Sequence, residues 1–216
     1  SGYTSFYLGA KSVCPSAKML VEFIGSWGDP AMEATTAEHL IDQGAVVISQ
    51  HSDSTTPATK CQEKGVYHVG YNIDMSDVAP EASIVSSTID WTNYFVYVIE
   101  TIVNGGTVDQ DYMNHGIKEG DIKLTALNEE VAAAGTAEAI EAAKQDIVDG
   151  KLHVFDTSTF TVGGKEVTEA YLDMNADFTP DDVNAISDGY YHESVYKSAP
   201  NFDLRIDGIT LVNEAY

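Results

Sequence analysis

The feature of this sequence that most constrains its fold is a series of short apolar runs that alternate with helical patterns. The first run, residues 19–24, is typical of a buried strand; it ends at the turn 25–30, and a helical pattern follows to Gln43. Pro30 suits the first turn of that helix, and Asp29 can accept hydrogen bonds from its free N–H groups. The same order repeats, with strands predicted at 45–49, 66–71 and 82–86 and helices at 57–64 and 91–103. Elements that alternate at this spacing predict an α/β fold, a parallel-sheet lobe with flanking helices.

The loops of such a sheet differ between its two edges. Right-handed crossovers bring the carboxyl ends of the strands to one edge, where open α/β sheets form their ligand crevice. The loops there carry aromatic and polar residues, which we take as candidate ligand-binding residues: Trp27, Gly28, Asp29, His51, Ser52, Asp53, Asn72, Asp74, Asp90 and Trp91. The opposite edge holds plain turns such as Gln43-Gly44 and Lys64-Gly65. This asymmetry locates the site but does not name the ligand.

The two tryptophans each have two interpretations. Trp27 is either a stacking plate for a planar ligand or a hydrophobic plug, and we favour the plate. Trp91 either faces the ligand or joins Phe95, Val98 and Ile102, which follow it at helical spacing, in a stripe that faces the core.

The polar candidates also have an ordinary structural alternative. Asp90 contacts the ligand or caps the helix that follows it. The loop 51–54 can donate N–H groups to an anion or a carbonyl, but Ser and Asp are also the usual residues for capping a helix.

Enzymatic and metal-binding patterns are missing from the sequence. His51 and Asp53 could suggest catalysis, but the chain has no nucleophile elbow, no phosphate loop and no G-x-G-x-x-G motif. Residues 173–177 are similar to a calcium loop, yet Phe178 stands where the turn demands Gly, and Asn184 stands where a bidentate Glu belongs. The other histidines lack metal-ligand spacing. We therefore predict a non-enzymatic protein with no catalytic residues, no cofactor and no metal.

The charge of the chain restricts its partners. Eleven Lys and Arg residues stand against 34 Asp and Glu residues, which gives a net charge of −23. Such a field repels nucleic acid and anionic lipid, so we expect no nucleic-acid partner. No apolar run of 18 residues occurs, so no transmembrane helix is expected. Cys14 and Cys61 either pair in an oxidising compartment or remain two free, partly buried thiols, which we favour.

The texture of the sequence changes after Gly105-Gly106. We predict a ligand-binding lobe over residues 1–105 and a return or hinge segment with a C-terminal extension over residues 106–216. Within the second part we expect a strand at 121–127, a helix at 136–149 with Ile140, Ala143 and Ile147 inward, a hairpin at 163–164 and a capped helix start at 179–182. The remainder to Tyr216 has no firm period.

Two stretches carry a family resemblance: GSWGDPAMEATTAEHLIDQGAVVISQHSDSTTPATKCQEKGVYHVGYNIDMS and SSTIDWTNYF. They resemble the basic membrane lipoprotein family, extracytoplasmic substrate-binding proteins of ABC importers, some of which bind purine nucleosides or bases. The match is close over residues 3–155 and weak beyond. The resemblance implies a type I periplasmic-binding fold, in which two α/β lobes clamp a small planar ligand, and it implies an ABC transporter permease as partner and a lipid anchor at the cell membrane surface.

The resemblance also assigns roles to individual residues. Trp27 occupies the place of the aromatic that stacks on the base, and Asn72 and Asp74 lie in the segment that supplies a carboxylate to the sugar, whose two oxygens can accept both vicinal hydroxyl protons. Asp90 departs from the pattern, because nucleoside-binding members have a Lys there that also reaches the ribose. A free nucleobase, or another planar or cationic molecule, therefore competes with a nucleoside.

The first lobe of the family has no counterpart in this sequence. The chain starts at Ser1 without an initiator Met or signal peptide, so we expect a piece of a longer protein, and we expect it to bind ligand weakly by itself. Two other classes of function stay open as alternatives: a small nucleotide-processing α/β enzyme and a ligand-sensing regulatory domain.

Overall fold

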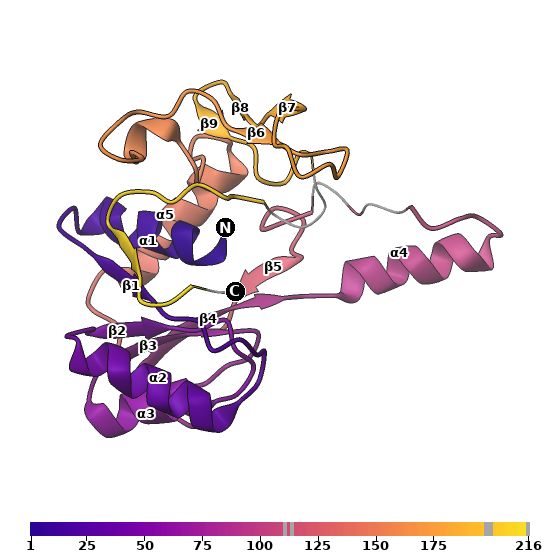
Figure 1. Ribbon diagram of the computed structural model, residues 1–216. Helices are drawn as coiled ribbons and strands as arrows, with labels where there is room; N and C mark the ends of the chain where they lie inside the picture. The colour runs from indigo at the N-terminus through magenta and orange to yellow at the C-terminus, as the bar shows by residue number, and fades with distance from the viewer. Residues whose placement is uncertain (110–111, 113–114, 197–200, 215–216) are drawn as a thin grey trace. The chain divides into compact units, whose positions relative to one another are not determined.

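The computed structural model describes residues 1–109, 112, 115–196 and 201–214. The chain forms two compact units, each of which is built from three segments of sequence (Figure 1). We call residues 22–108, 115–148 and 211–216 the α/β unit, and residues 1–21, 109–114 and 149–210 the hairpin unit. The predicted lobes at 1–105 and 106–216 each contribute to both units, and that division stays a prediction.

The α/β unit is built around a four-stranded sheet in the order β2-β3-β4-β5. Its strands are β2 (Val47–Ser49), β3 (Tyr67–Tyr71), β4 (Ser83–Ile89) and β5 (Ile122–Leu124). The first three are parallel, and β5 runs antiparallel to β4. The predicted α/β fold class is therefore confirmed, as is a strand within residues 121–127.

Two helices cover one face of this sheet. They are α2 (Pro30–Asp42) and α3 (Thr56–Lys64), which pack against each other below β2 and β3 in Figure 1. Local sequence explains the start of α2, since Pro30 occupies its first turn and the Asp29 carboxylate accepts a hydrogen bond from Met32 N at 3.0 Å. The core between helices and sheet consists of Ile48, Ala58, Cys61, Met75, Ala79 and Ala82.

The close pairing of β3 with β4 depends on a glycine. A Cβ atom added at Gly70 would lie 2.2 Å from Ser86 Oγ and 3.2 Å from Met75 Sδ. A side chain at this position therefore requires the Ser86 side chain to move. The Ser86 hydroxyl is itself buried, and no described residue accepts or donates a hydrogen bond to it.

The hairpin unit has a second, separate core. Its elements are α1 (Gly2–Val13), β1 (Met19–Val21), the short 3-10 helix η1 (Thr157–Thr159), β6 (Tyr171–Leu172), β7 (Val183–Asn184), β8 (Ile186–Ser187), β9 (Tyr190–Tyr191) and β10 (Ile209–Leu211), whose last residue belongs to the α/β unit. β6 pairs with β7, β8 with β9, and β1 with β10. Aromatic side chains dominate the core, which contains Tyr7, Phe155, Phe160, Tyr191 and Phe202.

Several expectations about elements were wrong. β1 is a three-residue, half-buried strand that pairs with β10 rather than joining the parallel sheet, because residues 22–24 leave the strand conformation. Residues 179–182 do not form a helix: Asp182 N bonds to Leu172 O, which leads the chain into β7. The Gly163-Gly164 turn is present, although its hairpin is limited to one bridge between Val162 and Lys165.

The predicted inward face of one helix was wrong, and that of a second was only partly right. In α4 (Thr92–Val103) no residue is buried, and Phe95 and Ile102 are 56% and 61% exposed. Figure 1 shows α4 extending away from the sheet beyond the end of β4, so its apolar stripe has no core to face. In α5 (Thr136–Val148) Ile140 and Ile147 are half-buried, whereas Ala143 is exposed and no residue is fully buried.

The two cysteines are free thiols, as we favoured. Cys61 is buried in the α/β core, and burial raises the pKa of its thiol to about 12. Cys14, which was expected to be partly buried, is exposed at the end of α1, because the helix stops there and the chain turns toward solvent.

Candidate functional site

The turn at residues 25–29 presents Trp27 to solvent. Its side chain is 73% exposed, so the indole is not the hydrophobic plug of the alternative interpretation. The turn is closed by Gly28 N, which donates to Ser26 Oγ at 3.2 Å, and it is tied to the next loop by Asp53 N, which donates to Trp27 O at 2.7 Å. The backbone of Trp27 is therefore fixed while its ring is free to contact a ligand.

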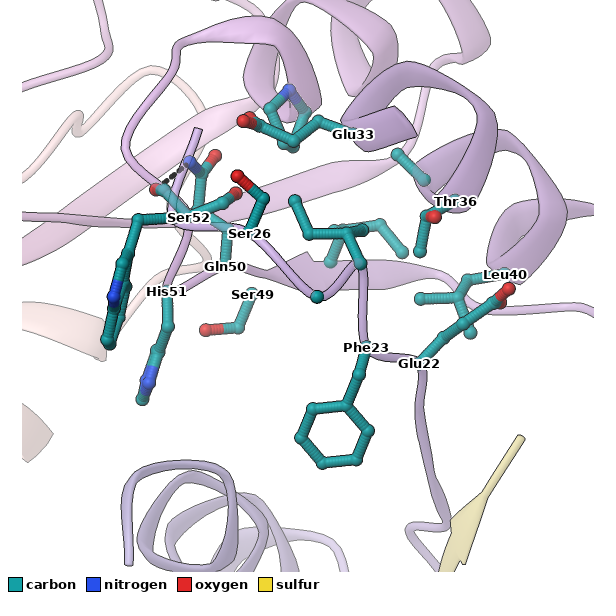
Figure 2. Close-up of a pocket in the computed structure, with 16 residues that line it drawn as sticks. Glu22, Phe23, Ser26, Glu33, Thr36, Leu40, Ser49, Gln50, His51 and Ser52 are labelled. Atoms are coloured by element: carbon teal, nitrogen blue, oxygen red, sulfur yellow. Dashed lines mark hydrogen bonds between the residues drawn. The ribbon is translucent and has the colours of Figure 1, made fainter. Parts of the chain in front are cut away.

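A cavity of about 410 Å³ lies beside this turn, between residues 22–27, α2 and the end of β2. Its walls are largely apolar and include Phe23, Ile24, Ala37, Leu40 and Ile48. Figure 2 shows Ser26, Gln50 and Ser52 together toward one end of the cavity and Glu22 and Leu40 toward the other. An apolar cavity with a few polar groups at its mouth is the usual form of a small-molecule site.

Glu33 places a buried carboxylate on the wall of this cavity. It is 2% exposed, and both of its oxygens are used: Oε1 accepts from Asp29 N at 3.0 Å, and Oε2 accepts from Ser54 Oγ at 2.5 Å. Glu33 thus joins the Trp27 turn to the loop 50–55. Its role in the site is not evident from the sequence, although its position three residues after Pro30 marks it as a residue of the first helical turn.

The loop 50–55 follows β2 and carries three of the predicted site residues. Gln50 Nε2 donates to Ser52 O at 2.8 Å and to Ser54 O at 2.7 Å, which holds the loop in a tight arc. The imidazole of His51 stacks on Tyr71, with ring centroids 5.0 Å apart. Residue His51 is exposed overall, but partial desolvation of its ring lowers the pKa, so at neutral pH it is uncharged and offers one donor and one acceptor.

The loop after β3 holds Asn72 and Asp74 at the same edge. Asn72 adopts the left-handed conformation (φ 67°), its N–H donates to Ser87 O at 2.7 Å, and its side chain is exposed. Asp74 is exposed as well, and one of its oxygens accepts from Ser76 N at 2.9 Å. Asp74 therefore stabilises a turn through one carboxylate oxygen.

Asp90, at the end of β4, is held by two neighbours. Its carboxylate accepts from Lys123 Nζ at 2.5 Å and from Thr92 N, in the first turn of the following helix, at 2.9 Å, although the N-cap position of that helix is occupied by Trp91 rather than by Asp90. These bonds, the one from Lys123 first, hold the pKa of Asp90 well below its usual range. Lys123 reaches this point because β5 pairs with β4 in a register that sets Ile122 opposite Ile89.

Two residues of this edge, Tyr71 and Lys123, were not predicted from the sequence. For Trp91 the sequence allowed two roles, a ligand contact or a core residue. Tyr71 supplies the ring under His51, and Lys123 supplies a cation; a pairing between strands more than thirty residues apart gives no local signal. Trp91 is 54% exposed at the start of α4, where its ring meets those of Tyr94 and Phe95 at 6.0 and 6.4 Å. It is not a core residue.

The edge as a whole offers stacking surfaces together with neutral and charged hydrogen-bonding groups. Links between neighbouring loops bring the predicted residues together in a row: the turn 25–29 to the loop 50–55, that loop to β3, and β3 to β4. Within the described part of the chain, no three His, Cys, Asp or Glu side chains are grouped so that they could hold a metal ion. Nor is any helix of that part both long and apolar enough to cross a bilayer.

Comparison with known proteins gives a consistent picture. A family model described as "ABC transporter substrate-binding protein PnrA-like" matches residues 1–156, close to the extent of the resemblance in the sequence. A "Purine-binding protein" of Brucella abortus is 35% identical over 57% of this chain and 35% of its own length. A "Putative ABC transporter glucose-binding protein" of Haloferax volcanii is 29% identical over 71% of this chain and 39% of its own. This chain thus spans little more than a third of the length of either relative.

Solved structures agree at the level of the fold. An ABC transporter solute-binding protein of Conexibacter woesei superposes with a TM-score of 0.53 at 17% identity, over 67% of this chain and 49% of that one. A likeness at this identity speaks for a shared architecture. It supports a lobe of the periplasmic-binding type.

Proposed function

Because this chain belongs to the family of PnrA-like ABC transporter substrate-binding proteins, which are solute-binding proteins and not enzymes, we propose that it forms one ligand-binding lobe of an extracytoplasmic receptor for a purine base or nucleoside. The observation that carries the proposal is the exposed Trp27 ring, fixed at its backbone beside an apolar cavity. Stacking of a base on such a ring contributes about 1–3 kcal/mol. The purine-binding relative supports the choice of ligand.

The polar groups at this edge of the sheet are suited to form hydrogen bonds with the rim of a planar heterocycle. Neutral His51 and the exposed Asn72 amide each offer a donor and an acceptor, which a purine ring also presents. Asp90 is neutralised by Lys123, so this end of the site offers an ion pair rather than a free anion. A nucleoside, with hydroxyls that can bond to both Asp90 and Lys123, therefore stays among the candidates.

The mechanism would be closure of a second lobe over the ligand. Contacts made only in the closed state bias an equilibrium between open and closed forms, and an ABC transporter permease would recognise the closed one. We also propose that a lipid anchor holds the receptor at the extracytoplasmic surface of the cell membrane. One lobe alone supplies one wall of the site, so this chain by itself should bind only weakly.

Titration of this chain with adenine, hypoxanthine, guanosine, adenosine and glucose, followed by NMR up to millimolar ligand, tests the proposal. Glucose is included because of the glucose-binding relative and because an indole also stacks on sugar rings. We expect a purine to bind and Trp27→Ala to weaken binding by about 5- to 150-fold, which corresponds to the loss of stacking. Phe178→Ala is the matched control, since Phe178 is an exposed aromatic of the hairpin unit.

Binding of glucose but not of any purine would replace the purine assignment with a sugar. Equal purine affinity in Trp27→Ala and in the unaltered chain would contradict the stacking role.

A further inference from the structure

A buried polar pair lies beneath the loop 50–55. His68 on β3 is 0% exposed, Gln50 is 6% exposed, and His68 Nε2 is 2.9 Å from Gln50 Oε1. Polar groups are costly to bury unless they are hydrogen-bonded, and an apolar pair would fill the same space more cheaply. The pair therefore does something that apolar side chains could not do.

The hydrogen bonds fix the role of each group. Gln50 Nε2 lies 2.8 Å from Ser52 O and 2.7 Å from Ser54 O, so both amide hydrogens are donated to the loop. Its Oε1 can only accept, and the hydrogen in that bond must come from His68 Nε2. The other ring nitrogen, Nδ1, is then an acceptor that faces Ser83 Oγ at 3.5 Å. Burial lowers the pKa of His68 to about 4, which maintains this neutral form near neutral pH.

Two sets of hydrogen bonds connect the loop 50–55 to the Trp27 turn. Asp53 N donates to Trp27 O at 2.7 Å. Ser54 Oγ donates to one oxygen of Glu33 at 2.5 Å, and the other oxygen of Glu33 accepts from Asp29 N at 3.0 Å. Both sets start in the loop 50–55, where the carbonyls of Ser52 and Ser54 accept hydrogen bonds from the buried Gln50 amide.

We propose that His68, acting through Gln50, is a positioning residue that holds the Trp27 turn in the geometry in which the indole meets a ligand. The effect on affinity rests on the proposed function, whereas the geometry of the turn can be measured without a ligand. His68 touches neither the cavity nor the indole, so its contribution is indirect.

Fluorine NMR of the chain labelled with fluorotryptophan tests the proposal. The two tryptophans give two resonances, which Trp91→Phe assigns. His68→Leu removes the N–H donor, His68→Gln retains a donor at the position of Nε2, Gln50→Glu removes the two donors to the loop, and Ser83→Ala changes only the weak contact to Nδ1. We expect the Trp27 resonance to shift or split in His68→Leu and Gln50→Glu and to match the unaltered chain in His68→Gln and Ser83→Ala. The Trp91 resonance should not move in any of them.

Adenine titration of the same samples provides the second readout. Loss of the loop's hydrogen bonds should weaken adenine binding about tenfold in His68→Leu, with recovery in His68→Gln. If no purine binds but the Trp27 resonance responds as expected, the positioning role stands and the purine assignment fails. An unchanged Trp27 resonance in His68→Leu, equal shifts of both tryptophans, or no recovery in His68→Gln would overturn the positioning role.

Discussion

At the scale of single residues, the α/β unit places polar atoms where a sheet usually holds apolar ones. His68, Gln50 and Glu33 are buried with hydrogen bonds, whereas the side-chain hydroxyl of Ser86 is buried without any partner among the described residues. A buried hydroxyl without a partner carries the full cost of its lost hydration. The hydrogen-bonded groups thus support the binding edge. The Ser86 hydroxyl stays unpaired at a place where β3 and β4 pack closely together.

The contact between Gly70 and Ser86 yields a test by double mutation. Gly70→Ala should destabilise the chain by about 1–3 kcal/mol, since its Cβ would overlap Ser86 Oγ. Ser86→Ala should be close to neutral, because it removes a hydroxyl that has no partner. The double variant should lose less than Gly70→Ala alone, as measured by urea unfolding. Additive effects would show that the two residues do not interact.

His68 makes stability depend on pH with a defined sign. Its pKa falls from 6.5 to about 4 on folding, so the native state favours the neutral ring. The resulting stability is present above pH 6.5 and is lost as the pH falls from 6.5 toward 4, by up to about 3 kcal/mol. His68→Gln does not titrate and should lack this part of the acid loss.

The free energy of unfolding of both chains, measured by urea at several pH values in that interval, gives the comparison. Parallel curves for the two chains would contradict the assignment of the slope to His68. His51, whose pKa is also lowered, adds to the slope in both chains alike and cancels in the difference.

At the scale of elements, helices whose boundaries are encoded locally were predictable. α2 starts at an Asp-Pro pair that caps it, and α3 ends at a glycine in the left-handed conformation, Gly65. The two-residue strands β6 to β9 were not predicted, since so short a strand contains no period. Pairing between strands that are far apart in the sequence could not be predicted either, because it has no local signal. The pairing of β1 with β10 and the position of Lys123 beside Asp90 are therefore seen only in the structure.

The stripe on α4 was misread for a different physical reason. Helical spacing of apolar residues indicates a face that needs cover, but it does not say which element supplies the cover. The loops after the three parallel strands β2, β3 and β4 follow from the predicted topology, whereas the Trp27 turn precedes α2 without following a strand of that sheet. Whether each of those residues contacts a ligand stays a prediction.

Exposure of α4 can be measured by a matched pair of substitutions. Ile102→Ala should change the free energy of unfolding by no more than about 0.5 kcal/mol, because Ile102 is 61% exposed. Ile48→Ala, at a position that is 5% exposed, should cost about 2–5 kcal/mol. Urea unfolding compares them, and similar losses for the two isoleucines would contradict the exposed placement of α4.

At the scale of the whole molecule, charge repulsion opposes the compact state. The net charge of −23 is spread over 216 residues, with few cations to offset it. Salt screens such repulsion over distances that fall from about 10 Å at 0.1 M to about 3 Å at 1 M. The excess of acidic residues favours solubility but lowers the stability of the folded state, by an amount that depends on the salt concentration.

Thermal unfolding in sodium chloride should therefore shift upward between about 0.1 M and about 1 M salt. Each kcal/mol of relieved repulsion should raise Tm by about 2–4 °C. Sucrose is the control, because it favours compact states without screening charge. A Tm that rises in sucrose but not in salt would rule out repulsion as the cause.

Each unit is gathered from three separate segments, which the chain visits alternately. No single restriction site or stop codon can therefore release either unit as one continuous reading frame. An engineer who wants the α/β unit alone must delete residues 1–21 and splice out two internal stretches, closing each gap with a designed linker. A single truncation, the customary first step toward a minimal fragment, would remove residues of both units, although the buried core of the α/β unit lies within one segment, residues 22–108.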